Sequence, residues 1–147
     1  MILYLDTSAY VRLYIREAAR EVLLGAVGVA TLIASHAIAY TEMRAALARM
    51  LRMHRLRKIE YTAVLKAYEL DWSNTLQVMP AEALIRRAGD LAERFGLRGC
   101  DSVHLAAAES LAVAPSAVPV TFVAFDAALN AAAEALGLPT LGASEGQ

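Results

Sequence analysis

Short runs of apolar residues alternate along the chain with longer segments in which apolar residues recur at helical spacing. The short runs resemble buried β-strands and lie at residues 2–5, 31–35, 76–79 and 120–125, with 140–141 as a candidate edge strand. The longer segments predict helices at residues 9–26 (interrupted near Arg16), 37–58, 59–72, 80–95, 101–114 and 126–137. Thr7 or Ser8 can cap the first helix, and Asp6 is the alternative cap.

This alternation predicts the fold class. Short apolar strands that alternate with helices are typical of an α/β domain, in which helices cover both faces of a central, mostly parallel sheet. The chain has 147 residues and shows no repeat and no low-complexity linker. We therefore expect a single domain over residues 1–141 and a frayed tail at residues 142–147.

Composition and charge narrow the class of protein. With 58% hydrophobic and 20% charged residues the chain is not disordered, and a net charge of −1 excludes nucleic-acid binding through overall charge alone. The mean hydropathy of +0.43 indicates apolar surface that a partner covers. We expect a cytoplasmic protein, because we see no signal peptide or membrane-spanning run and the single cysteine, Cys100, cannot form an internal disulfide. Cys100 is expected to be buried.

Three of the five aspartates lie where a predicted strand ends or a helix begins. Asp6 follows the first strand, Asp126 follows the last strong strand, and Asp101 begins a helix. Carboxyl ends of parallel strands meet at one edge of a sheet, where open α/β sheets place their ligand sites. Glu42 follows the second strand by about two helical turns. We therefore expect the four carboxylates to share one crevice, although an aspartate before a helix is more often only a cap.

Four clustered carboxylates predict a bound metal ion. Like charges at close range repel, and without a cation some of these groups would hold protons. Mg²⁺ favours oxygen ligands, keeps several waters and is typically held by one or two carboxylates. Such ions activate water and stabilise the leaving oxygen of a phosphodiester. The expected chemistry is therefore metal-assisted phosphodiester hydrolysis.

Four segments of the sequence resemble the PIN-domain family, in the order and spacing of the VapC-type toxins of bacterial toxin–antitoxin systems. They are YLDTS at residues 4–8, AYTEMR at 39–44, GCDSVHLA at 99–106 and FVAFDAAL at 122–129. A single segment is weakly specific, whereas the ordered set covers nearly the whole chain. The resemblance implies a PIN-like α/β/α sandwich and a metal-dependent endoribonuclease that holds Mg²⁺ or Mn²⁺. It also implies a cognate antitoxin and a homodimer.

The resemblance also implies roles for individual residues. By position, the acidic catalytic site would consist of Asp6, Glu42, Asp101 and Asp126. The three aspartates would be the metal ligands, and Ser8 would lie beside them as a substrate-binding hydroxyl. His104 matches a position that is commonly structural in the family. One departure is Ala124, because the family often has Thr or Ser two residues before the last acid. It favours a water-mediated contact of Asp126 with the metal.

A basic stretch at residues 43–59 is the candidate RNA-binding segment. It contains no acid, and its basic residues are Arg44, Arg49, Arg52, His54, Arg55, Arg57 and Lys58. Such a patch attracts an RNA backbone, but its side chains fan around the predicted helix, so a solvated helix face is the alternative. Arg44 is the strongest candidate for substrate contact because it lies half a turn from Glu42.

Two other functions fit parts of the sequence. A phosphatase of the haloacid-dehalogenase type would use Asp6 as its nucleophile, but it needs a second Asp where this chain has Ser8. It also needs a well-placed lysine, and the chain has only Lys58 and Lys66. A non-catalytic PIN-like module would bind RNA or protein without cutting, and the four intact carboxylates argue against it.

Overall fold

Strand β1 (Ile2–Leu5) lies at the centre of a five-stranded sheet. In the computed structural model, which describes residues 1–116 and 118–141, the strand order is β3-β2-β1-β4-β5 and all neighbouring strands are parallel. The other strands are β2 (Leu32–His36), β3 (Leu76–Val78), β4 (Val120–Val123) and β5 (Thr140–Leu141). The predicted α/β class is confirmed.

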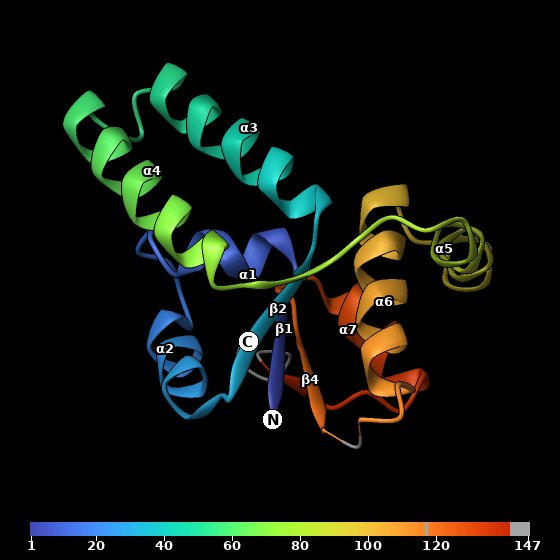
Figure 1. Cartoon of the computed structure of the whole chain (residues 1–147). Coiled ribbons are helices and arrows are strands. Elements are labelled where there is room, and N and C mark those ends of the chain that lie inside the picture. The colour runs from blue at the N-terminus through green and yellow to red at the C-terminus, as the bar shows by residue number, and fades with distance from the viewer. Residues whose placement is uncertain (117, 142–147) are drawn as a thin grey trace.

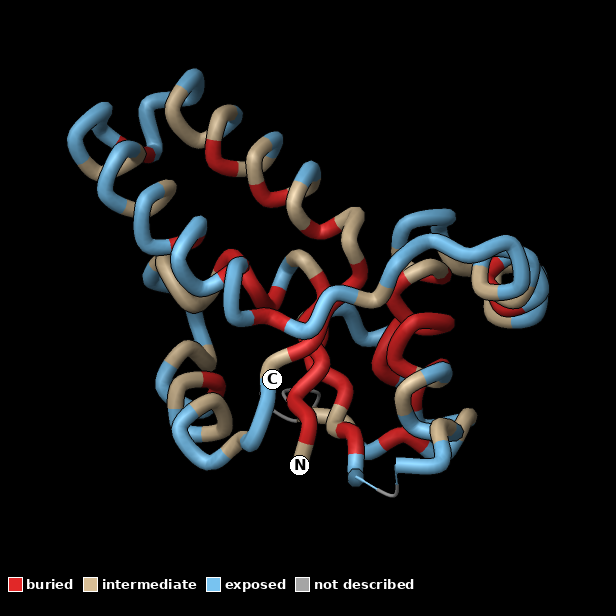
Figure 2. Tube along the Cα trace, viewed as in Figure 1, coloured by how far each residue is buried: buried red, intermediate tan, exposed pale blue. Residues whose placement is uncertain are grey.

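The residues of β1 alternate between two hydrophobic cores, because successive side chains of a strand point to opposite faces of its sheet. Ile2 and Tyr4 pack on the face covered by α5 (Glu82–Phe95), α6 (Gly99–Ala112) and α7 (Ala127–Ala135). Leu3 and Leu5 pack on the face covered by α1 (Thr7–Arg12), α2 (Arg20–Val29), α3 (Ile38–Arg52) and α4 (Lys58–Ser73). Figure 1 shows helices on both sides of the strands, and Figure 2 shows that the central strands are buried.

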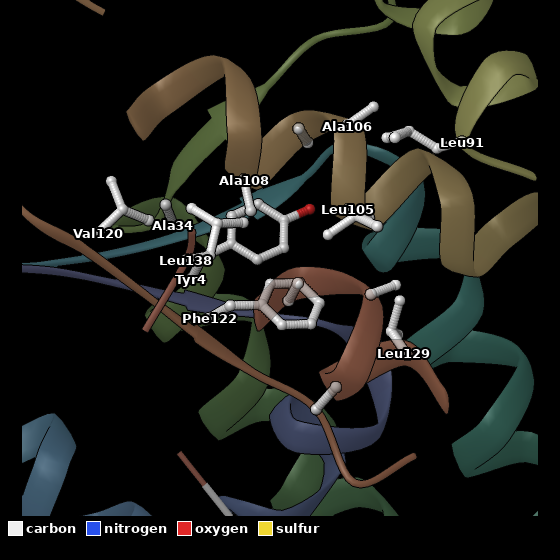
Figure 3. Packing of buried hydrophobic residues seen from close by; sticks show 14 of the residues in the cluster. Tyr4, Ala34, Leu91, Leu105, Ala106, Ala108, Val120, Phe122, Leu129 and Leu138 are labelled. Atoms are coloured by element: carbon white, nitrogen blue, oxygen red, sulfur yellow. The ribbon is translucent and has the colours of Figure 1, made fainter. Parts of the chain in front are cut away.

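The core beneath α6 is built around two rings from neighbouring strands. Tyr4 and Phe122 stack with ring centroids 5.8 Å apart, and both side chains are fully buried (Figure 3). The alanines of α6, among them Ala106 and Ala108, pack against this cluster. Small side chains let a helix lie close to a sheet, so the residues at the start of α6 are held near the ends of β1 and β4.

Helix ends differ from the prediction where tertiary contacts decide them. The interruption of the first predicted helix is confirmed, but α1 begins at Thr7, because Asp6 is its cap and not Thr7 or Ser8. Helix α3 ends at Arg52 and not at residue 58. The chain turns at His54, whose φ is +55°, and Leu56 then packs into the core.

Three further expectations concern Cys100, membrane-spanning helices and the C-terminal tail. Cys100 is exposed, so its expected burial is wrong; the buried face of α6 begins at Ser102. Across the described residues, no helix combines the length and the apolar character needed to cross a membrane. The tail predicted at residues 142–147 lies outside the described residues.

Candidate active site

The four predicted carboxylates line one pocket at the carboxyl edge of the sheet. Asp6 directly follows β1 and Asp126 follows β4, which is the parallel neighbour of β1. Glu42 lies near the start of α3, and Asp101 lies in the first turn of α6. The pocket has a volume of about 280 Å³, and its lining is Asp6, Thr7, Ser8, Glu42, Arg98, Asp101, His104, Phe125 and Asp126. The fold therefore brings together acids from four separate segments.

Asp6 is the most buried acid of the pocket. Its side chain caps α1, where Oδ1 accepts hydrogen bonds from the Ala9 N–H at 2.9 Å and the Ser8 hydroxyl at 2.7 Å. Burial raises the pKa of Asp6, although His104 and the two hydrogen bonds act to lower it, and the nearby charge of Asp101 raises it further. The charged form of this carboxylate is therefore costly without a cation.

Glu42 is held by two donors on a single oxygen. Its Oε1 accepts from the Thr7 hydroxyl at 2.8 Å and lies 2.8 Å from Nε2 of His104. Burial acts to raise the pKa of Glu42, but the hydrogen bond and charge of His104, with the Thr7 hydrogen bond, outweigh it and lower this pKa. Glu42 is thus an ionised carboxylate in a fixed orientation.

His104 connects Glu42 to the core. It is 2% exposed, and its Nδ1 lies 2.9 Å from the hydroxyl of Tyr4, which is fully buried. Burial and the charge of Asp6 raise the pKa of Tyr4, so its phenol stays protonated. Because the ionised carboxylate of Glu42 can only accept, Nε2 donates to it, and Nδ1 lies against the Tyr4 hydroxyl. His104, which the family resemblance predicts to be structural, therefore holds the carboxylate of Glu42 in place.

Asp101 is paired with a cation that the sequence reasoning missed. Nε of Arg98 lies 3.0 Å from Oδ2 of Asp101, and the Arg98 side chain is 83% exposed at the mouth of the pocket. The spacing of three residues at a helix start was the available signal, because side chains at i and i+3 are neighbours on a helix. Asp101 itself lies in the first turn of α6 and does not cap it.

Asp126 and Ser8 also line the pocket. Asp126 is exposed and caps α7, where its Oδ1 accepts from the Leu129 N–H at 2.8 Å. The Ser8 hydroxyl donates to Asp6 and accepts weakly from the Phe125 N–H at 3.3 Å. Ser8 thus connects the segments that follow β1 and β4.

Arg44 does not line this pocket. Its guanidinium donates to the Tyr40 hydroxyl at 2.8 Å and pairs with Glu69 at 3.4 Å, on the side of α3 that faces α4. The structure therefore brings Asp6, Ser8, Glu42, Asp101 and Asp126 together and places Arg44 outside them.

The donor set of the pocket fits a hard divalent cation. Its candidate ligands are carboxylate oxygens, which Mg²⁺ and Mn²⁺ prefer. Among the described residues, no three His, Cys, Asp or Glu side chains already lie close enough to hold one ion together. This geometry suits an ion bound by one or two carboxylates with several waters. A cation beside Asp6 would also lower the raised pKa of that carboxyl.

Comparisons with known proteins agree on one family. The sequence pattern of the PIN domain matches residues 3–135. Two proteins of Mycobacterium tuberculosis, Ribonuclease VapC45 of strain CDC 1551 / Oshkosh and Ribonuclease VapC49 of strain ATCC 25618 / H37Rv, are each 34% identical to this chain over 136 residues. Each match covers 92% of this chain and 92% of the relative.

Two solved structures share the fold. VapBC-1 from nontypeable Haemophilus influenzae matches with a TM-score of 0.64 and 15% identity, over 99% of this chain and 100% of that chain. FitAB bound to the IR36 DNA fragment matches with a TM-score of 0.59 and 17% identity, over 97% of this chain and 95% of that chain. At these identities the likeness concerns the fold alone.

Proposed function

This chain belongs to the PIN-domain family, and from that premise we propose that it is a VapC-type endoribonuclease toxin that hydrolyses RNA phosphodiesters with Mg²⁺ or Mn²⁺. The observation that carries the proposal is the convergence of four carboxylates on one pocket. The names of the two ribonuclease relatives support the reaction class, since each aligns over 92% of the chain.

The chain's own residues would share the work as follows. Asp6, Asp101 and Asp126 would face the metal ion, one or two of them as direct ligands and the rest through water. The ion would supply an activated water and neutralise charge on the scissile phosphodiester. Glu42, whose Oε1 is already engaged by Thr7 and His104, has Oε2 left to orient the attacking water.

Substrate contacts are proposed at the rim of the pocket and beside it. Arg98, exposed at the mouth, can move from Asp101 to an RNA phosphate, because guanidinium groups bind phosphate well. Ser8 offers a hydroxyl to the bound RNA strand. Arg44 would contact RNA only outside the pocket, since Tyr40 and Glu69 hold its guanidinium there.

Cleavage of a mixed pool of structured RNAs tests the function. We expect discrete cuts by the purified protein with Mg²⁺ or Mn²⁺, no cuts with EDTA, and a loss of about 100-fold or more in Asp101→Asn. Asp90→Asn on α5 is the matched control, because Asp90 is exposed and lies outside the pocket. A folded wild-type protein that binds RNA and cuts none in any metal would contradict the proposal and indicate a non-catalytic module.

Two protein partners complete the proposal: a cognate antitoxin and a second copy of the chain in a homodimer. Several large apolar side chains remain exposed on the described surface, including Val29, Ile59, Leu70 and Val113. Their exposure supports protein partners that cover parts of this surface. The resemblance of the sequence to the VapC-type toxins of toxin–antitoxin systems, with two VapC relatives at 34% identity, supports the antitoxin. Light scattering tests the dimer, and co-purification with the product of an adjacent gene tests the antitoxin. We place the toxin in the cytoplasm, where its RNA substrates are.

A further inference from the structure

The end of α3 and the start of α4 form an exposed, strongly basic surface. We define it by five cations, Arg49, Arg52, Arg55, Arg57 and Lys58, and call it the basic tip. All five residues are exposed. The α3–α4 hairpin projects from the body of the molecule, and most of its end is solvent-exposed (Figures 1 and 2).

The turn that carries the basic tip has a defined conformation. Leu56 is only 9% exposed and packs into the core shared by α1, α3 and α4, so it anchors the turn. The N–H groups of Arg55 and Leu56 donate to the Met50 carbonyl at 2.8 and 3.3 Å, and His54 takes a left-handed backbone conformation. The cations are therefore presented from a fixed position.

Most of the charge at the basic tip is not neutralised. Within the described part of the chain, its one ion pair joins Arg57 to Glu60 at 2.9 Å, while Arg52, Arg55 and Lys58 form none. Residues 43–59 hold six of the chain's 14 Lys and Arg and none of its 15 Asp and Glu. The rest of the chain is thus net negative, and the basic tip is the surface suited to a polyanion.

The acidic pocket is a poor source of long-range attraction for RNA, because its four carboxylates outweigh the combined charge of one divalent cation and Arg98. Four carboxylates line it, and Arg98 is its only Arg or Lys among the described residues. The attraction must therefore come from elsewhere on the molecule. Helix α3 links the pocket to the basic tip, because it runs from Glu42 to Arg52 in one unbroken helix. These ten residues span about 15 Å at ~1.5 Å each, a distance that an extended single RNA strand covers in a few nucleotides.

We propose that the basic tip binds the backbone of the RNA substrate a few nucleotides away from the phosphodiester that is cut. This inference rests on the proposed ribonuclease function and deepens it, because it sets a minimal length for an efficient substrate. A tetranucleotide that is cut at its central bond leaves two nucleotides on either side of the pocket, too few to reach the basic tip, whereas a strand of 20 nucleotides reaches it.

Binding of a 20-nucleotide single-stranded RNA, measured as a function of salt, tests this proposal. The probe is titrated with Asp101→Asn protein, which prevents cutting, with or without Arg52→Gln and Arg55→Gln. We expect the double substitution to weaken binding about tenfold at low salt and to reduce the slope of log affinity against log salt by ~1.4, at ~0.7 per lost phosphate contact. Arg86→Gln with Arg94→Gln on α5 is the control of equal charge, and it should change neither quantity.

Cleavage by the otherwise wild-type protein supplies the second readout. The tip variant should lose efficiency on the 20-nucleotide RNA through KM, and about twofold or less on a tetranucleotide. If the wild type cuts both RNAs and the tip and control variants behave alike, this inference is overturned while the proposed function stands. If the wild type cuts neither RNA, the proposed function fails first. If the tip variant loses self-association in sedimentation but keeps RNA affinity, the basic tip is a contact between copies.

Discussion

The two ends of α3 carry opposite charges in opposite surroundings. At its start, Glu42 is held by Thr7 and His104 in a half-buried pocket. At its end and in the turn that follows, Arg52 and Arg55 are exposed and form no ion pair with a described residue. Burial and hydrogen bonds fix reacting groups in place, where small displacements are costly. Exposed charges act over a longer range and are screened by salt. Substitutions at the first end should therefore change kcat, and those at the second should change KM.

The largest effect is expected from Glu42→Gln, which removes the charge at the buried end of α3 and keeps the size of the side chain. We expect kcat to fall by about 100-fold or more, with little change in affinity for RNA, because the basic tip remains intact. Single-turnover cleavage and RNA binding measure the two quantities. Glu93→Gln on α5 is the matched control, since Glu93 is exposed outside the pocket. A loss confined to RNA affinity would contradict the assigned role of Glu42.

A smaller loss is expected from His104→Gln, which disturbs the support of Glu42 while the carboxylate stays. Residues that orient the groups of a metal site typically matter about 10- to 100-fold, and we expect kcat to fall in that range. Tyr4→Phe is the comparison, because it removes the hydroxyl 2.9 Å from His104 and leaves the contact with Glu42.

Both variants should lose about 1–3 kcal/mol of stability through an unpaired buried group. Thermal unfolding gives the Tm of each variant, and kcat is measured well below both Tm values. If His104 acts only on stability, the two variants will show the same kcat. A larger loss in His104→Gln supports positioning of Glu42.

Asp6→Asn should stabilise the metal-free protein at pH 7, although it removes activity. Asn can still accept from the Ala9 N–H and the Ser8 hydroxyl, while the buried charge that raises the pKa of Asp6 disappears. A gain of about 1 kcal/mol would raise Tm by roughly 2–4 °C in a domain of this size.

The pH dependence of this gain has a defined sign. The folded state disfavours the ionised form of Asp6, so the wild type is penalised above the raised pKa and recovers stability as pH falls through it. The gap between variant and wild type should therefore be widest near pH 7 and close in acid. Asp90→Asn should show no such gap, and added Mn²⁺ should favour the wild type. A variant less stable than wild type at pH 7 would show that the charge of Asp6 is not costly.

The sequence was sufficient for the sheet and for the convergence of the acids, because both follow from local pattern and parallel topology. Asp6 and Asp126 follow strands that turn out to be parallel neighbours, so their placement needed no side-chain detail. Glu42 and Asp101 needed only the order of the elements. The sequence left open whether these aspartates only cap helices or line the site. Asp6 and Asp126 do both.

The missed features depend on contacts between distant parts of the chain. His104 meets Tyr4 across 100 residues and Glu42 across 62, and no spacing rule reports such a pair. The early end of α3 depends on the burial of Leu56, which competes with continued helix. The ion pair of Arg98 with Asp101 could have been predicted from the i,i+3 spacing of the two residues.

The smallest effect, and the one in the opposite direction, is expected from Glu60→Gln beside the basic tip. Glu60 pairs with Arg57 at 2.9 Å and also accepts from the Arg57 backbone N–H at the start of α4. Gln serves in the same capping arrangement, so the helix start should survive while Arg57 becomes free to meet a phosphate. We expect a modest rise in affinity for the 20-nucleotide RNA and a salt slope steeper by about 0.7, with kcat unchanged. Glu82→Gln, which frees Arg86 on α5, is the matched control. Equal gains in both variants would mean that only net charge matters, whereas a gain confined to Glu60→Gln would place the RNA on the basic tip.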